Sequence, residues 1–338
     1  MAESSRRALL LLNPKARNGN SDVDAALQRL EAGGIELIEL SPAGPDDVVP
    51  EILKHAEGAD LLIAGGGDGT MHTVAGALAK TGLTLALLPL GTANDLARSL
   101  GIPDDLGQAA EIIVNGRTVR IDLGEVNGRA FFNVAHIGLA AEIPRNTSQV
   151  EKRYLGPLSY LIAVFRTLRR NRRFTARVTI DGKLQALRSN QLSVANGRHF
   201  GGGMVIDEGA KMDSGQLVLS SWKLRSFGRL VLIGLAMRRG QHHYFSEVSQ
   251  ANGRLIEVDT DKPRRLTADG EEIGRAVCTG IQCNRRITPR HVGGDARVHV
   301  DRLSRGNKGH GRLGRHVDAG AVGTDPRVGR VPLARHVL

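Results

Sequence analysis

Three polar turns in the first hundred residues carry side chains and backbone amides of the kind that bind phosphate. The turn GGGDGT (residues 65–70) follows an apolar run and precedes a helical pattern. Its glycines would let the backbone approach an anion closely, and the first amides of the helix would point toward that anion. Asp68 would repel a phosphate unless a magnesium ion lies between the two negative groups. A tight structural turn explains the same glycines without any ligand, and this alternative stays open.

The turns PLGTANDL (residues 89–96) and NPKAR (residues 13–17) carry similar chemistry. Thr92 and Asn94 can form hydrogen bonds with phosphate or ribose, and Asp95 adds a second carboxylate at a helix start. The alternative is that Thr92 or Asn94 caps this helix while Asp95 complements its dipole. The GGGDGT turn itself matches neither the G-x-x-x-x-G-K-[ST] P-loop nor the dinucleotide-binding pattern G-x-G-x-x-G.

Apolar runs and helical patterns alternate through the first 125 residues, which predicts an α/β domain with a parallel sheet and helices on both faces. The carboxyl ends of parallel strands share one edge of the sheet, and ligands bind at that edge. The three turns should therefore converge. Strands are predicted at residues 6–12, 35–40, 59–64 and 83–88, with helices after Ser21, Pro45, Asp68 and Asp95.

Beyond about residue 125 the segments become short, apolar and bounded by turns. This pattern predicts a mostly-β domain, arranged as a sandwich. Strands are expected near residues 130–135, 175–180, 190–195, 216–222 and 253–258, and helical patterns remain at residues 155–170 and 226–239.

The chain has 338 residues, which suits two domains, and a net charge of +11. Much of that charge lies in residues 276–338, which contain twelve Lys and Arg, four Asp and no aromatic residue. The absence of aromatics to stack on bases argues against a nucleic-acid-binding arm. We expect an α/β nucleotide-binding domain at residues 4–125, a β-sandwich domain at residues 126–275, and an unpatterned basic segment at residues 276–338. A disordered extension and a shifted reading frame near Ala276 both explain that segment.

The motifs NPKA, GGGDGT and PLGTANDLARSLGIP, in this order, resemble the catalytic domain of the diacylglycerol kinase family. The similarity is greatest to its bacterial lipid kinase branch, and GGGDGT alone is shared with NAD kinases. Three later segments resemble the β-sandwich domain of that family, so the resemblance covers roughly residues 6–275. They are FFNVAHIGLAAEI (131–143), ANGRHFGGGMVIDEGAKMDSGQL (195–217) and ADGEEIG (268–274).

This resemblance implies a lipid kinase that uses ATP and Mg²⁺ to phosphorylate a hydroxyl of diacylglycerol or a similar membrane lipid, with a place in phospholipid metabolism. It implies that Glu271 is the general base, with Asp269 in the same turn and Asp68 among the catalytic acids. It implies catalytic magnesium ligands at Asp68, Asp95 and Asp122, and a structural magnesium site near Asp213. The implied nucleotide-binding positions are Asn13, Lys15, Arg17, Ser41, Gly66, Gly67, Asp68, Gly69, Thr70, Thr73, Gly91, Thr92 and Asn94.

Several features depart from the family pattern or have simpler explanations. Asp269-Gly270 is also the strongest short signal for a plain β-hairpin turn. The family's Asn and Glu after GGGDGT are replaced by His72 and Thr73, and its usual Asp by Ser214. We also considered a related kinase with a soluble substrate, as in NAD kinases, and a nucleotide-binding protein inactivated by its altered C-terminus.

A lipid substrate implies work at a membrane surface, although no apolar run approaches the roughly 20 residues that span a bilayer. Residues 155–174 combine an apolar helical half with a cluster of arginines, which suits an anionic membrane surface. A packed helix with solvated arginines at its end explains the same segment. We therefore expect a cytoplasmic protein, peripheral at the inner face of the membrane. The oligomeric state stays open, a homodimer included. The arginines concerned are Arg166, Arg169, Arg170, Arg172 and Arg173.

Overall fold

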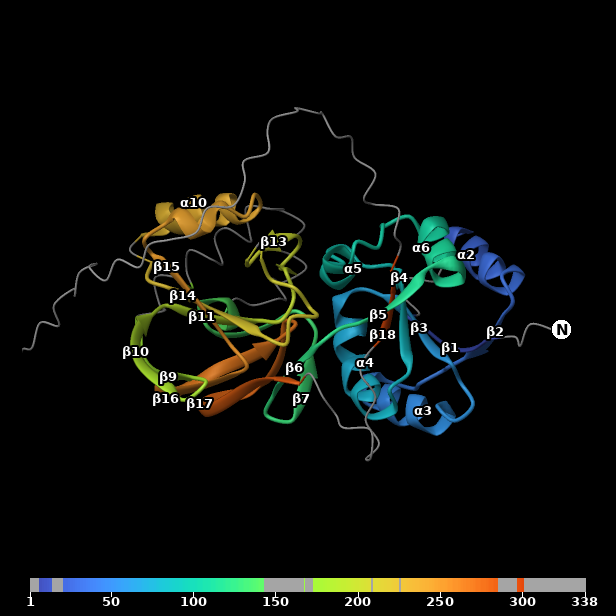
Figure 1. Ribbon diagram of the computed structural model, residues 1–338, viewed down its shortest axis with the longest axis horizontal. Coiled ribbons are helices and arrows are strands. Elements are labelled where there is room, and N and C mark those ends of the chain that lie inside the picture. The colour runs from blue at the N-terminus through green and yellow to red at the C-terminus, as the bar shows by residue number, and fades with distance from the viewer. Residues whose placement is uncertain are drawn as a thin grey trace, which may run out of the picture. The chain divides into compact units, whose positions relative to one another are not determined.

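The N-terminal part of the chain forms a parallel sheet with helices on both faces, which confirms the predicted fold class. The computed structural model describes residues 6–13, 21–142, 167, 173–207, 209–224, 226–284 and 297–300. Four parallel strands pair in the order β2-β1-β3-β4. Figure 1 shows helices α2 and α6 on one face of this sheet and α3 and α4 on the other. The bounds are β1 (Arg6–Leu12), α2 (Ser21–Ala32), β2 (Ile35–Glu39), η1 (Pro45–Asp47), α3 (Val48–His55), β3 (Leu61–Gly66), α4 (Asp68–Thr81), β4 (Thr84–Pro89), α5 (Asp95–Leu100) and α6 (Leu106–Asn115).

The central strands are apolar on both faces because helices cover both sides of the sheet. Leu9 of β1 and Leu62 and Ile63 of β3 are completely buried. Helix α4 ends at Thr81, and the next residue, Gly82, adopts a left-handed conformation and donates its amide to the Leu78 carbonyl. The sheet edge that carries the strand ends is therefore built on a rigid, close-packed base.

Two further strands extend the sheet on the β4 side. Strand β18 (Arg297–Val300) pairs in parallel with β4 and antiparallel with β5 (Arg117–Arg120). The sequence pattern did not predict this strand, because the segment is only four residues long and its neighbours in sequence show no strand period. Residues far along the chain thus complete the first domain's sheet.

The C-terminal part forms the predicted antiparallel sandwich. Its long strand β16 pairs with β8 over residues 266–268, with β9 over residues 256–260, and with β17 along most of its length. Shifts of register interrupt the β16–β17 ladder, and such bulges bend a strand so that it can serve both layers. In Figure 1 this hairpin lies at the lower side of the sandwich, and β11, β14 and β15 lie above it.

The remaining elements belong to this sandwich and its edges. They are β6 (Leu123–Val126), β7 (Arg129–Phe131), β8 (Val134–Gly138), α7 (Leu139–Glu142), β9 (Phe174–Ile180), β10 (Lys183–Ser189), β11 (Gln191–Ala195), β12 (His199–Phe200), β13 (Met204–Val205), β14 (Leu217–Trp222), α10 (Phe227–Met237), η2 (Gln241–Tyr244), β15 (Val248–Gly253), β16 (Leu255–Ala268) and β17 (Glu271–Asn284).

The structure corrects two details of the sequence analysis. The unpatterned segment does not begin at residue 276, because β17 continues to Asn284. Its buried positions there include the small Ala276 and the polar Thr279. Together with the bulges, these residues hide the alternation of apolar and polar residues that marks a strand. The single strand expected at residues 130–135 is two strands, β7 and β8, with a break at residues 132–133. The helical pattern at residues 155–170 lies outside the described residues, Thr167 excepted.

Candidate active site

Two glycine turns touch each other at the carboxyl ends of β3 and β4. The amide of Leu90 donates to the Gly66 carbonyl at 3.0 Å. A Cβ atom on Gly91 would lie 2.5 Å from the Cα of Gly67, which is closer than real Cβ contacts come. Only glycine at residue 91 therefore lets the backbones of the two turns meet without displacing one of them. The convergence expected from the sequence is present for these two turns.

Asp68 and Asp95 belong to these turns and lie against each other. The Oδ1 atom of Asp68 accepts the backbone amide of Asp95 at 2.8 Å. Burial, and next the negative charge of Asp95, raises the pKa of the Asp68 carboxyl. Two acids held together in this way favour a cation beside them.

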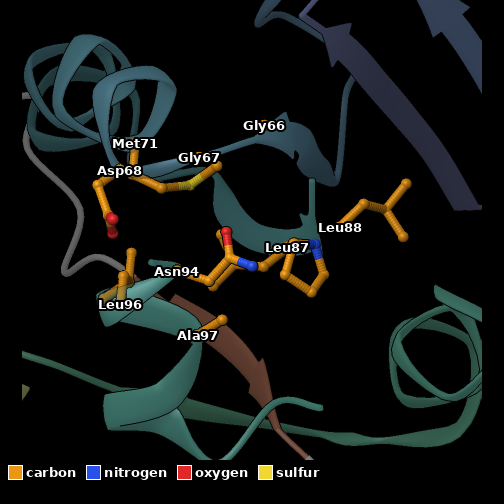
Figure 2. Close-up of a pocket in the computed structure, with 10 residues that line it drawn as sticks. Gly66, Gly67, Asp68, Met71, Leu87, Leu88, Asn94, Leu96 and Ala97 are labelled. Atoms are coloured by element: carbon orange, nitrogen blue, oxygen red, sulfur yellow. The ribbon is translucent and has the colours of Figure 1, made fainter. Parts of the chain in front are cut away.

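A pocket of about 200 Å³, counted with its open mouth, lies between the two turns and the start of α5. Figure 2 shows the Asp68 carboxylate pointing from α4 toward Leu96. Asn94 and Met71 also line the pocket, so its wall combines a carboxylate and an amide with apolar atoms.

Asn94 shapes the second turn through both atoms of its amide. Its backbone is left-handed, with φ of 48°. Its Oδ1 accepts the Gly91 amide at 2.9 Å, while its Nδ2 donates to the Gly91 carbonyl at 2.9 Å and to Asp104 at 3.0 Å. The Asn94 side chain is thus engaged in holding the turn, and its α5 capping role is not seen.

The carboxylate of Asp95 reaches a hairpin of the second domain. Its two oxygens accept the amides of Gly202 at 3.0 Å and Gly203 at 2.8 Å. Gly201, Gly202 and Gly203 all have positive φ, between 59° and 88°, which other residues rarely adopt. Nearby, Ser99 of α5 lies 3.2 Å from His199 of β12. The start of α5 is thereby tied to the β12–β13 hairpin.

Asp269 forms the tip of the β16–β17 hairpin and organises the chain beside it. Asp269 and Gly270 have φ of 45° and 86°, which is the pattern of a type I′ turn, so the hairpin interpretation is correct for the backbone. Its carboxylate accepts the amides of Phe132, Asn133 and Val134 at 2.7–3.0 Å. These bonds explain the break between β7 and β8. Burial raises the pKa of the Asp269 carboxyl despite these three donors.

Comparison with known proteins agrees with this geometry. Residues 7–126 match the model of the diacylglycerol kinase catalytic domain, and residues 133–292 match that of the YegS C-terminal NAD kinase beta sandwich-like domain. A protein of Pseudomonas aeruginosa named "Probable lipid kinase YegS-like" is 38% identical over 226 residues, which cover 63% of this chain and 71% of that protein. The chain belongs to the diacylglycerol kinase family of lipid kinases.

Further relatives of this kinase cover more of the chain at lower identity. A diacylglycerol kinase of Staphylococcus aureus is 27% identical over 83% of this chain and 91% of its own length. A crystal structure of a candidate diacylglycerol kinase from Bacillus anthracis has a TM-score of 0.72 at 26% identity, covering 89% of this chain and 97% of its own. A third, a diacylglycerol kinase from the same organism, has a TM-score of 0.68 at 23% identity and supports the fold alone, covering 89% of this chain and 98% of its own.

Buried polar atoms without a partner gather around the Asp269 hairpin of the kinase. Within the described part of the chain, His72 Nδ1, Asn133 Oδ1 and Asn196 Oδ1 have no hydrogen-bond partner. The positive form of His72 would lower the pKa of Asp269, so the two side chains lie within electrostatic reach. Unsatisfied buried groups call for an explanation, and a bound polar substrate or water would satisfy them.

The four predicted metal ligands lie in two places, Asp68 beside Asp95 and Asp122 beside the turn that contains Asp213. Asp122 Oδ2 accepts the Gly215 amide at 2.6 Å in the turn before β14, and Asp213 is exposed in that same turn. Asn196 connects this region to the hairpin, because its Nδ2 donates to the carbonyls of Asp122 and Phe132 at 2.8 Å each. Among the residues that the structure describes, no three acids, histidines or cysteines cluster as a metal site.

The other predicted residues follow the strand ends or open α4. Asn13 follows β1, and its backbone amide donates to the Gly65 carbonyl at 2.9 Å. Ser41 is exposed and lies two residues after β2. Thr73 Oγ1 donates to the Gly69 carbonyl at 3.0 Å, which engages its hydroxyl within α4. Lys15 and Arg17 lie outside the described residues, and Thr70, Thr92 and Glu271 are half-buried or exposed.

Sequence reasoning gave no separate role to Asn196 or to the three consecutive glycines after Phe200. The run of three glycines was a usable signal, since such a run is costly unless the backbone must adopt positive φ. The long-range partner of that run, Asp95, was not predictable from local pattern.

Proposed function

We propose that this kinase transfers the γ-phosphate of ATP to a hydroxyl of a membrane lipid, diacylglycerol or a similar molecule, in a reaction that requires Mg²⁺. One observation carries the proposal. Asp68 and Asp95 meet where the Gly67 and Gly91 backbones touch, and the charge of Asp269 also acts to raise the pKa of Asp68. Two phosphate-type turns, an acid pair and a further acidic hairpin are the parts that phosphoryl transfer requires.

Asp68 and Asp95 fit the needs of a magnesium ion. Mg²⁺ retains several waters and is usually bound through one or two carboxylates together with substrate phosphates, so three clustered acids are not required. When bound, the ion would neutralise negative charge on the phosphates. The pKa of Asp68 is raised first by burial and then by the charge of Asp95, and a bound cation would offset both effects.

The glycine turns would hold the nucleotide. The amides of residues 67–70 open helix α4, and the positive end of the helix dipole favours phosphate there. Asn13, Ser41 and Thr92 follow strands β1, β2 and β4, whose carboxyl ends share one edge with β3. We assign them, with Lys15, Arg17, Gly66 and Thr70, to nucleotide contacts, and we assign Asn94 to positioning Gly91.

Glu271 would accept the proton of the lipid hydroxyl as that hydroxyl attacks the γ-phosphate. It is exposed at the first residue of β17, directly after the Asp269-Gly270 turn. A carboxylate that a substrate hydroxyl can reach is able to accept a proton from it. Asp269 has its carboxylate engaged by three amides, so we assign it to positioning the hairpin that carries Glu271. We assign Asp122 to a supporting role for the catalytic magnesium. Its carboxylate accepts the Gly215 amide in the turn near Asp213, and Asn196 connects its backbone to Phe132 beside the hairpin.

A radiolabelled ATP assay on mixed vesicles tests the proposal. Label should enter the organic extract when Mg²⁺ and a hydroxyl-bearing lipid are present, and chelation of the metal should stop its transfer. The mobility of the product would identify the lipid. NAD in place of lipid tests the soluble-substrate alternative. Transfer to NAD with no extractable product from any lipid would refute lipid phosphorylation.

A further inference from the structure

Helix α10 of the sandwich domain is apolar on two opposite faces. Ile233 and Met237 are completely buried against Trp222 and Leu224. On the other side, Leu232 and Leu235 are 50% and 62% exposed, and Val231 is 36% exposed. A helix that is apolar all round is normally covered on both faces, so the outward face of α10 calls for a partner.

The exposed residues of α10 form one continuous stripe. Val231 and Leu235 are separated by one helical turn, and Leu232 lies three residues before Leu235, so all three neighbour one another on the surface. Tyr244 of η2, which packs next to α10, is 78% exposed. Three of the seven large exposed apolar side chains among the described residues belong to this helix. Figure 1 shows α10 along the side of the sandwich over β14 and β15.

The surroundings of this stripe are basic. Residues 214–246 contain five Lys and Arg and neither Asp nor Glu. Arg238 and Arg239 follow directly on α10, and both are exposed, as is Lys223. No ion pair within the described ranges involves these three residues. An apolar stripe bordered by free basic side chains matches an anionic membrane surface, which offers acyl chains below negative headgroups.

Helix α10 is held firmly enough to serve as a platform. Arg229 forms two hydrogen bonds of 2.7 Å with the carboxylate of Glu247, and its guanidinium lies 5.1 Å from the ring centroid of Phe245. Glu247 is 7% exposed, so the pair is largely shielded on its acidic side. Glu247, the acid that follows residues 214–246 in sequence, is therefore paired with Arg229.

We propose that the outward face of α10, with Tyr244 and the arginines at residues 238 and 239, docks this kinase on an anionic lipid bilayer. This inference rests on the proposed function, because a lipid kinase must reach a substrate that stays in the membrane. It assigns the contact to described residues of the sandwich domain, separately from the arginine-rich segment at residues 155–174. Leu232 and Leu235 enter the interfacial region, while Arg238 and Arg239 meet headgroups.

Co-sedimentation with vesicles tests this docking surface on the full chain. The vesicles contain phosphatidylglycerol with phosphatidylcholine, or phosphatidylcholine alone. The Leu232→Ser/Leu235→Ser and Arg238→Gln/Arg239→Gln variants should each bind anionic vesicles at least tenfold more weakly than wild type. The arginine variant loses two basic residues, each of which contributes about fivefold near such a surface. The leucine variant loses the apolar area that enters the interface. Binding of the wild type should weaken as salt is added.

Matched variants separate a local effect from a general one. Leu184 of β10 is 67% exposed, and neighbouring Lys183 is also exposed. The Leu184→Ser and Lys183→Gln variants should bind vesicles as wild type does. Unfolding temperatures should be equal across all four variants, because every replaced side chain is exposed. If the apolar variant unfolds early, the arginine variant alone decides the result.

The outcomes distinguish this proposal from the proposed function. Vesicle binding that depends on α10, with no lipid phosphorylated, would support docking and refute the kinase reaction. Lipid phosphorylation with vesicle binding unchanged in both α10 variants would refute docking and leave the reaction standing. A wild-type dimer that the α10 variants convert to monomer, with vesicle binding unchanged, would assign the face to a second copy and also overturn the proposal.

Discussion

The backbone amide of Asp95 donates a 2.8 Å hydrogen bond to the carboxylate of Asp68. This bond joins the turn after β3 to the start of α5, and the Asp95 side chain continues the connection to Gly202 and Gly203 of the sandwich domain. Asp68 thus binds the backbone of Asp95, and the side chain of Asp95 binds the second domain. Removal of the charge at Asp68 should therefore affect catalysis, while any oxygen at that position can still keep the connection.

The Asp68→Asn substitution should strongly reduce activity without unfolding the protein. Burial and the charge of Asp95 raise the pKa of Asp68, so its ionised form is less favourable in the folded chain than in the unfolded chain. An amide oxygen can still accept the Asp95 amide. We expect a free energy of unfolding equal to or above that of wild type, measured in urea without Mg²⁺, and an activity at least about 100-fold lower. A large loss of stability would contradict this assignment.

The Gly91→Ala substitution should separate the two glycine turns. Its Cβ would meet the Gly67 backbone at 2.5 Å, and backbone cannot rotate away as a side chain can. We expect a loss of about 1–3 kcal/mol in the free energy of unfolding, together with weaker ATP binding in calorimetry. Gly76→Ala in α4 is the control, because nothing lies within 4 Å of its Cβ, and alanine should stabilise that helix by up to about 1 kcal/mol. Equal effects of the two substitutions would argue against the contact.

The Asp269→Asn substitution should lower the free energy of unfolding more than the Asp181→Asn substitution does. Both residues form Asp-Gly turns with positive φ, and both carboxylates accept backbone amides. Asp269 is buried and binds three amides, so an amide replacement leaves at least one buried donor unpaired, at a cost of about 1–3 kcal/mol. Asp181 is exposed, and Asp181→Asn should cost less than about 1 kcal/mol. Urea unfolding of the two variants measures the difference.

The Arg229–Glu247 pair should make stability fall in acid. Hydrogen bonds from Arg229 lower the pKa of Glu247 from its ordinary value of 4.5 to about 2. A lowered pKa in the folded state means that the pair stabilises the protein above pH 4.5, and that this contribution is lost as the pH falls from about 4.5 toward 2. Thermal unfolding of Glu247→Gln should show a flatter decline across that interval than wild type. Parallel declines would show that other groups dominate the acid transition.

Sequence alone predicted the fold class well. The strands β1, β3 and β4 contain continuous buried apolar runs between helical segments, and both signals are local. Strand β18 was missed because it is short, and the extension of β17 was missed because bulges and the polar Thr279 obscure its period. The break at residues 132–133 depends on the carboxylate of Asp269, more than 130 residues away, so no local pattern indicated it.

The candidate site was predicted in its parts and less well in its connections. Glycine turns with nearby acids pointed to Asp68 and Asp95, because both lie at strand ends of one sheet edge. The role of Asn94 in holding Gly91, and that of Asn196 between Asp122 and Phe132, depend on side-chain directions that sequence spacing does not reveal. Glu271 came from the family resemblance, since an Asp-Gly-Glu turn by itself is an ordinary hairpin.

The most direct test of the account compares Glu271→Gln with Glu272→Gln. These neighbours occupy successive positions of β17, both are exposed, and Glu272 forms an ion pair with Arg265 at 3.2 Å. The measurement is the initial rate of radiolabelled phosphate transfer from ATP to vesicle lipid. If Glu271 is the general base, Glu271→Gln lowers that rate by about 10²–10⁴-fold while ATP still binds, and Glu272→Gln stays within about threefold of wild type. Similar rates in the two variants would contradict the assignment of the base to this hairpin.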